Sequence, residues 1–139
     1  MNSAIHFDSY SEGRTNFKQL LDAAEEGRVA TVSRDAAKTA VVDARRMRHF
    51  LASVTPSRAQ VVAEAGWWSV FIPGLPVAAD AELFDDALAD MVTALREYAE
   101  DWQDHLRDAP NHKENWGLVQ LIVLSSDEQL TAWLVSDTR

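Results

Sequence analysis

The residues of this chain best suited to chemistry are three carboxylates and an imidazole in one polar stretch: Asp101, Asp104, His105 and Asp108. On a helix, positions three or four apart share a face, so these side chains could together bind a divalent cation. A run of charges on a helix is nevertheless far more often its solvated face. No two of the four histidines stand four residues apart, the spacing that puts two metal ligands on one helix face. We therefore expect neither a metal nor a cofactor.

Other catalytic motifs are missing from the sequence. It has no cysteine, which excludes thiol nucleophiles, disulfides and thiolate zinc sites. It has no glycine-rich phosphate loop and no Gly-x-Ser-x-Gly motif. Asn111, His112 and Asn115 could line an active-site loop, but a polar connection that Trp116 anchors to the core is the simpler interpretation. We expect a protein that is not an enzyme.

A third group of polar residues gathers at the start of the first predicted helix. Ser11, Arg14, Thr15 and Lys18 share a face there. Hydroxyls, a guanidinium and free backbone amides at a helix N-terminus suit phosphate, and arginine is the commonest reader of guanine in the major groove. The alternative is that Arg14 and Lys18 only solvate an amphipathic helix. Spacing alone favours that alternative.

Charge divides the chain into two parts. The net charge of −9 argues at first sight against nucleic acid, because DNA binding depends on cations. Residues 1–58, however, carry nine lysines and arginines against seven acids, a balance of +2, and residues 59–139 carry four against fifteen, a balance of −11. This split indicates two tasks. The acidic part either faces a basic partner or serves only solubility.

The hydrophobic pattern predicts the elements that position these residues. In the first half, residues 5–7 alternate as a strand does, and Ser9-Tyr10-Ser11-Glu12 is typical of a capping box. Apolar residues then recur at helical spacing until Gly27, which predicts one helix over residues 9–27. A hairpin over residues 29–33 and 39–42 follows, and then a helix from Asp43 to Pro56. The order is strand, helix, hairpin, helix.

The second half predicts a small α/β unit with one long helix, so the chain as a whole belongs to the α+β class. Residues 60–64 and 67–72 form a second predicted hairpin, and a helix runs from about Asp80 to Leu106. Residues 118–124 are a compact apolar run that predicts a strand, and Ser125-Ser126-Asp127-Glu128 begins a last helix. No apolar run approaches the ~20 residues that cross a bilayer. The N-terminus lacks the features of a secretory signal, so we expect a cytoplasmic protein.

The first half resembles the Phd/YefM antitoxin family. The resemblance rests on FDSYSEGRTNF at residues 7–17 and VATVSRDAAKTAVVDARRMRHF at residues 29–50. It implies a homodimer, or a higher oligomer, that places the start of the first helix in the major groove of a palindromic operator. The resemblance also implies that Ser9, Ser11, Arg14, Thr15 and Arg34 face the DNA. Lys18 lies on the same helix face and is predicted to face it too. The sequence departs from the family at Gly13, where alanine is common, and in a turn without glycine at residues 35–37.

The second half is similar to the HicB antitoxin domain. The similarity rests on WWSVFIPGLP at residues 67–76 and ELFDDALADMVTALREYAEDW at residues 82–102. The glycine-rich spacer that is usual between these two segments is absent. Domains of this kind bind a toxin and do not catalyse. The two resemblances imply a DNA-binding and dimerisation domain over residues 1–56 and an acidic toxin-binding domain over residues 57–139.

Together these observations predict an antitoxin of a type II toxin–antitoxin system. It would repress its own operon and bind a cognate toxin, expected to be a RelE-like ribonuclease, with no membrane partner. Aromatic and apolar anchors dominate interfaces, so Trp116, Trp133 and Leu134 are the predicted toxin contacts, although the same residues could be core. The alternative is a protein-interaction module with a repressor-like fold that does not bind DNA.

Overall fold

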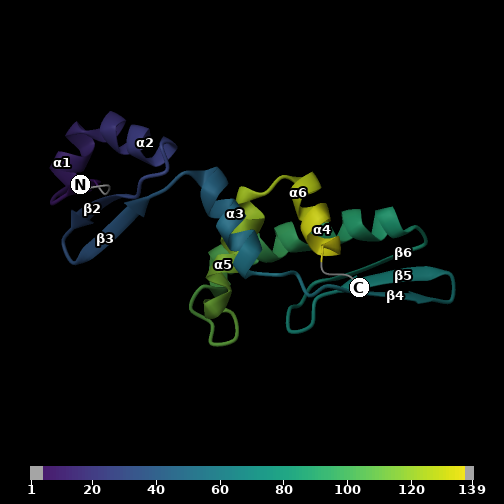
Figure 1. Ribbon diagram of the computed structural model, residues 1–139. Helices are drawn as coiled ribbons and strands as arrows, with labels where there is room; N and C mark the ends of the chain where they lie inside the picture. The colour runs from purple at the N-terminus through teal and green to yellow at the C-terminus, as the bar shows by residue number, and fades with distance from the viewer. Residues whose placement is uncertain (1–4, 137–139) are drawn as a thin grey trace. The chain divides into compact units, whose positions relative to one another are not determined.

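The computed structural model describes residues 5–136, and the chain divides into two compact units between Met47 and Arg48. Unit 1 precedes this point and unit 2 follows it. The predicted α+β class is confirmed, because helices accompany two separate three-stranded sheets (Figure 1). The division between the units falls within helix α3 (Ala44–Val54). Among residues 5–136, no helix combines the length and the apolar composition that crossing a membrane requires.

Unit 1 is a three-stranded sheet with two short helices. Its elements are β1 (Ile5–Phe7), α1 (Tyr10–Thr15), α2 (Phe17–Glu25), β2 (Ala30–Arg34) and β3 (Ala37–Val41). The sheet order is β1-β2-β3, with β1 parallel and β3 antiparallel to β2. The predicted hairpin is therefore confirmed. Its turn needs no glycine, because Asp35 adopts the left-handed conformation (φ 54°) that aspartate tolerates better than most residues.

The predicted single helix over residues 9–27 is interrupted at Asn16. Asn16 leaves the helical conformation (φ −108°, ψ 29°), and its side-chain amide donates to the Glu12 carbonyl oxygen at 2.9 Å beside the backbone amide of the same residue at 3.0 Å. The expected start is confirmed, since the Ser9 hydroxyl accepts from the Glu12 amide. The Glu12 carboxylate, however, accepts from the Asp8 amide and not from that of Ser9. Gly27 follows α2 with φ 89°, as a terminating glycine should.

Unit 2 contains the second sheet and most of the helices. Its elements after α3 are β4 (Gln60–Glu64), β5 (Trp67–Phe71), β6 (Ala78–Ala81), α4 (Phe84–Asp101), the π-helix η1 (Trp102–Leu106), the 3-10 helix η2 (Lys113–Asn115), α5 (Trp116–Leu124) and α6 (Asp127–Val135). The sheet is antiparallel throughout, in the order β4-β5-β6. The predicted long helix begins at Phe84 and not at Asp80, because residues 78–81 pair with β5 as a third strand.

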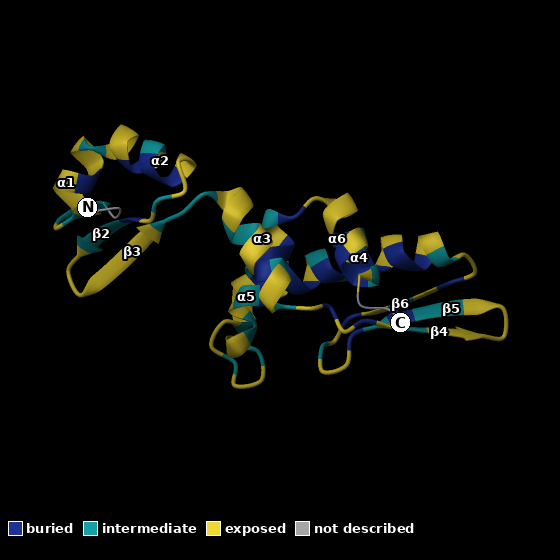
Figure 2. Ribbon diagram, in the orientation of Figure 1, coloured by how far each residue is buried: buried dark blue, intermediate teal, exposed yellow. Residues whose placement is uncertain are grey.

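The strand predicted over residues 118–124 is wrong, because this segment is helix α5. Periodicity cannot separate a short apolar strand from a buried helix when nearly every position is apolar. The burial pattern is helical, since Leu118, Val119, Leu121 and Ile122 are buried and Val123 is half exposed. α5 thus completes a core that α4 and α6 share (Figure 2).

The terminal helix α6 begins one residue later than expected. Its capping box pairs Ser126 with Gln129, whereas the sequence pattern indicated Ser125 with Glu128. The Ser125 hydroxyl is buried and engaged elsewhere: it donates to the Leu121 carbonyl at 2.6 Å and accepts from Arg48 Nε at 2.9 Å. Because that hydroxyl closes α5, Ser126 is left to cap α6.

Candidate nucleic-acid interface and partner surfaces

The predicted DNA-facing side chains lie on the surface of unit 1. Ser11, Arg14 and Thr15 are exposed on α1, and Lys18 is exposed at the start of α2. Ser9 is half buried, and its hydroxyl is occupied as the helix cap. The structure thus leaves the hydroxyls of Ser11 and Thr15 and two cations facing solvent on adjacent turns.

Lys18 is held by an acid on its own helix. Its ammonium nitrogen lies 2.8 Å from Asp22 Oδ2, one helical turn further on. The hydrogen bond with Asp22 raises the pKa of Lys18, and the charge of Asp22 acts in the same direction. Lys18 is therefore fully charged at neutral pH. Asp22 compensates part of this charge, so a phosphate that binds Lys18 would have to displace the Asp22 carboxylate.

Arg14 lies over the ring of Tyr10. Its guanidinium carbon is 5.9 Å from the ring centroid, at the outer limit of a cation–π contact. Tyr10 is itself more than half exposed. Among residues 5–136 no side chain forms an ion pair with the Arg14 guanidinium.

The structure brings Arg14 and Arg34 to one pocket. An open pocket of about 470 Å³ lies between the helices and the strands β2 and β3, and both arginines line it. The rest of its wall is mostly apolar and includes Tyr10, Phe17 and Val32. Ser11, Thr15 and Lys18 do not line it. The predicted DNA-facing residues therefore divide into two groups. Ser11, Thr15 and Lys18 lie on the helices outside the pocket, and Arg14 and Arg34 lie beside its apolar wall.

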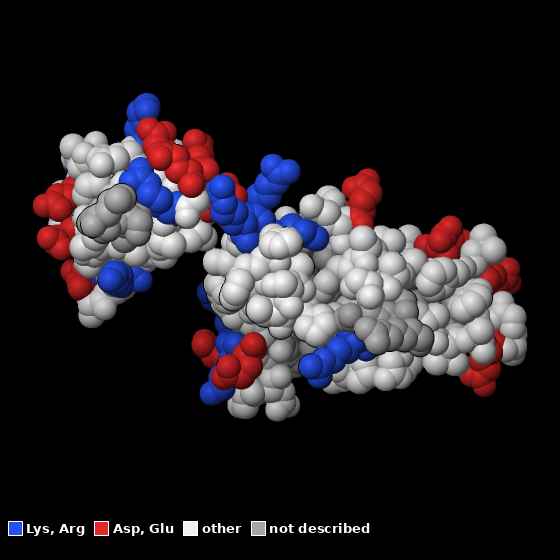
Figure 3. All heavy atoms as spheres, viewed as in Figure 1, with Lys and Arg blue, Asp and Glu red and all other residues white. Residues whose placement is uncertain are grey.

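Sequence reasoning missed the apolar residues of this surface. Tyr10 and Phe17 are 55% and 56% exposed, although helical spacing had predicted Phe17 as part of the buried face. The core of unit 1 is small: Leu20, Ala23 and Ala30 are buried, and a few strand residues pack against them. Basic and acidic side chains are interspersed on the face of unit 1 seen in Figure 3.

The three predicted toxin contacts differ in accessibility. Trp133 and Leu134 are 6% and 1% exposed, because α6 turns both of them into the core of unit 2. The Trp133 indole donates to the Thr55 carbonyl at 2.8 Å, and the Leu134 carbonyl accepts from Ser57. Trp116, at the start of α5, is 51% exposed. Of the three, only Trp116 presents a large side chain to a partner.

The acidic group at the end of α4 does not converge. Asp101 ends α4, and the π-helix η1 then changes the angular spacing of Asp104 and His105. Across residues 5–136, no three His, Asp or Glu side chains are placed to hold a metal ion. His105 Nδ1 lies 3.9 Å from the carboxylate of its neighbour Asp104, and both side chains are exposed.

Comparison with known proteins yields a structural match. No protein-family model matches the chain, and no curated protein matches its sequence. The fold is similar to that of a crystal structure from Syntrophomonas wolfei subsp. wolfei, described as an antitoxin part of a proposed toxin/antitoxin system. The TM-score is 0.79 and the sequence identity 20%, over 96% of each chain. The two chains therefore share a fold that includes both units.

Proposed function

We propose that this protein is the antitoxin of a type II toxin–antitoxin system, with a Phd/YefM-like first domain and a HicB-like second domain. The proposal depends on the fold that this chain shares with the Syntrophomonas wolfei protein over 96% of both chains. That protein is described as an antitoxin part of a toxin/antitoxin system. The two sequence resemblances support the same role, because the first lies mainly in unit 1 and the second lies in unit 2. DNA binding is assigned to residues 1–56 and toxin binding to residues 57–139.

DNA binding is proposed at the exposed face of α1 and the start of α2. Ser11, Arg14 and Thr15 would meet the major groove, and Lys18 and Arg34 would meet phosphates. Arg14 is exposed, and within residues 5–136 no acid forms an ion pair with its guanidinium, which suits the bidentate recognition of guanine. Ser9 contributes by capping α1 and so fixing its N-terminus.

Dimerisation of the first domain is proposed on the exposed apolar surface of unit 1. A unit of fewer than 50 residues buries a small share of its surface and is only marginally stable by itself. Tyr10, Phe17 and Val29 are each about half exposed and would be removed from water in a dimer. A dimer also matches the two-fold symmetry of a palindromic operator.

Toxin binding is proposed for the second domain, with Trp116 as the accessible member of the predicted contacts. The acids of residues 59–139 outnumber the bases by 11, which complements a basic ribonuclease of the RelE-like kind. Trp133 and Leu134 would act from within the core, by holding α6 and the neighbouring backbone in place.

A gel-shift titration with the DNA upstream of the gene tests the first domain. Arg14→Ala should weaken binding by about 1–3 kcal/mol at constant salt, because one guanine contact is lost. Arg107→Ala is the matched control, since Arg107 is an exposed arginine of unit 2 and should leave the affinity unchanged. If the wild type and Arg14→Ala bind this DNA with equal affinity, α1 is not the helix that contacts DNA.

One observation favours a second candidate, a protein-interaction module that does not bind DNA. Asp8 and Glu12 stand beside the N-terminus of α1, and the Asp8 side chain is 88% exposed. Carboxylates at this position repel phosphate. This candidate predicts that the wild-type chain does not shift the upstream DNA and still forms a complex with its protein partner.

A further inference from the structure

A long central stretch of unit 2 carries only negative charge. From residue 59 to residue 95 the sequence contains no lysine or arginine and six acids, which are Glu64, Asp80, Glu82, Asp85, Asp86 and Asp90. All six are exposed. Within residues 5–136 none of them forms an ion pair with a base. The stretch includes the whole sheet β4-β5-β6 and the first two thirds of α4, so this region attracts cations without an internal counter-charge.

The strand register separates the two faces of this sheet. Trp68 and Val70 face α4, since the Trp68 ring lies 5.2 Å from the ring of Phe84 and Val70 is buried. Side chains alternate along a strand, so Trp67, Ser69 and Phe71 point to the opposite face. Their cross-strand partners share that face. We call it the outer sheet face and define it by Val62, Glu64, Trp67, Ser69, Phe71 and Asp80.

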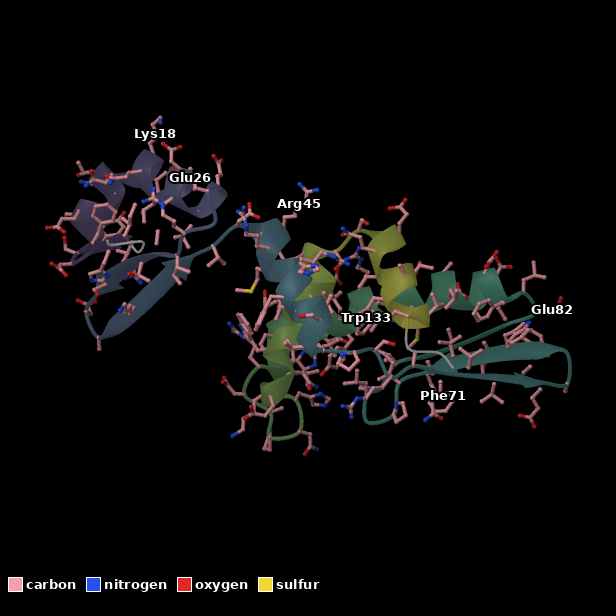
Figure 4. All side chains as sticks on the ribbon, in the orientation of Figure 1. Lys18, Glu26, Arg45, Phe71, Glu82 and Trp133 are labelled. Atoms are coloured by element: carbon pink, nitrogen blue, oxygen red, sulfur yellow. The ribbon has the colours of Figure 1, made fainter. Side chains whose placement is uncertain are left out.

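The outer sheet face combines apolar side chains with carboxylates. Val62 is 41% and Trp67 48% exposed, while Phe71, labelled in Figure 4, is half buried. Glu64 lies directly across from Trp67, and Asp80 accepts a hydrogen bond from Ser69. In the part of the chain that the structure describes, the helix α4 covers only the other face (Figure 1). An open sheet face with a large aromatic residue is a typical protein-binding surface.

We propose that the outer sheet face binds a basic protein partner, with Trp67 as its apolar anchor and Glu64 and Asp80 as the partners of its cations. Under the function proposed above, on which this step rests, that partner is the toxin. Charge argues against a second copy of this chain, because two such faces would bring their own carboxylates together. It also favours Trp67 over Trp116, since α5 carries no charged residue with which to select a basic partner.

The test measures binding of the full-length chain to the protein encoded by the neighbouring reading frame, by titration calorimetry and by association kinetics at two salt concentrations. Trp67→Ala should raise the Kd about tenfold or more, as the loss of a central aromatic anchor does. Glu64→Lys should slow association, with an effect that shrinks at high salt. The matched controls are Phe50→Ala, an exposed aromatic residue on α3, and Glu100→Lys, an exposed acid on α4 beyond the base-free stretch.

The outcomes separate this proposal from the proposed function. Loss of affinity with Trp67→Ala and Glu64→Lys, at an unchanged circular dichroism spectrum and with both controls intact, supports the outer sheet face. Tight binding that only Trp116→Ala weakens overturns this proposal and leaves the toxin-binding function standing. No binding by the wild-type chain overturns both. If Trp67→Ala instead lowers the oligomeric state of the free chain in sedimentation, the face joins copies of the chain and the proposal is wrong.

Discussion

Arg96 on α4 joins the end of one helix to the start of another by binding Asp127. Its Nη2 lies 2.8 Å from Asp127 Oδ1 in the first turn of α6, and it also donates to the Ser125 carbonyl at 2.8 Å. Nη1 donates to the Ile122 carbonyl at 2.6 Å. Carbonyls at the end of a helix lack the regular donor four residues on, so the guanidinium supplements the single Ser125 amide that donates to Ile122 at 3.3 Å. One side chain therefore fixes the turn between α5 and α6.

Arg96→Ala should lower the free energy of unfolding of unit 2 by about 1–3 kcal/mol, because the Ser125 carbonyl loses its arginine donor and the Ile122 carbonyl keeps only the long bond from the Ser125 amide at 3.3 Å. Asp127→Asn should cost less than about 1 kcal/mol, since the Asp127 side chain is 76% exposed and its ion pair is screened by water. All five tryptophans lie in unit 2, so urea unfolding followed by tryptophan fluorescence reports on this unit. If both variants lose the same free energy of unfolding, the ion pair with Asp127 is the dominant contact and the hydrogen bonds from Arg96 to the α5 carbonyls contribute little.

Tyr98 should hold the connection between α4 and α5 in place. Its hydroxyl lies 2.8 Å from His112 Nδ1 and accepts from Asn115 Nδ2 at 2.8 Å. Tyr98→Phe keeps the buried ring and removes both hydrogen bonds, so we expect a loss of about 1–2 kcal/mol and faster amide exchange around residues 109–115. Thr93→Val on the exposed face of α4 is the control. Unchanged exchange in Tyr98→Phe would show that Trp102, which donates to the His112 carbonyl at 2.7 Å, is sufficient.

The sequence predicted elements well where local chemistry determines them. The helix start at Ser9, the end at Gly27 and the two hairpins follow from caps, glycine and alternation, which act within a few residues. It failed where tertiary contacts decide. The apolar pattern of residues 118–124 does not distinguish a strand from a helix, and the packing of α5 against α4 is a tertiary contact that this pattern does not reveal.

The candidate surfaces show the same limit. The exposed cations of α1 could be predicted from helical spacing, because a helix face depends only on its own residues. The apolar pocket that Arg14 and Arg34 share depends on pairing between β2 and β3 and on the way α1 lies against them. Burial of Trp133 likewise depends on the distant Thr55 carbonyl. No pattern in the sequence indicates which of two similar aromatic residues finds such a partner.

Val32 gives a physical reason for the glycine at position 13. A Cβ added to Gly13 would lie 3.0 and 3.1 Å from the two methyl carbons of Val32, closer than side chains normally approach. Alanine would otherwise favour the helix by about 1 kcal/mol. We therefore expect Gly13→Ala to be nearly neutral in the wild type and to stabilise a Val32→Ala background by about 1 kcal/mol. A double-mutant cycle measures the coupling between positions 13 and 32, with the amide exchange of α2 as the measure of the stability of unit 1. If Gly13→Ala has the same effect with Val32 and with Ala at that position, contact with Val32 is not the reason for the glycine.

Under the DNA-binding function proposed above, Asp22 should weaken the binding by holding Lys18. Asp22→Asn removes the carboxylate at 2.8 Å from the Lys18 ammonium, so we expect about two- to fivefold tighter binding to the upstream DNA at low salt. Because the pKa of Lys18 is raised from an ordinary value of 10.5, any stability that its charge provides is fully present below that value and is lost only at higher pH. The gain in affinity should accordingly be constant between about pH 6 and pH 9. In a Lys18→Ala background most of the gain should vanish, and Glu114→Gln, which removes an exposed acid of unit 2, should not reproduce it. A gain that persists without Lys18 would mean that Asp22 acts on the DNA directly, by repulsion.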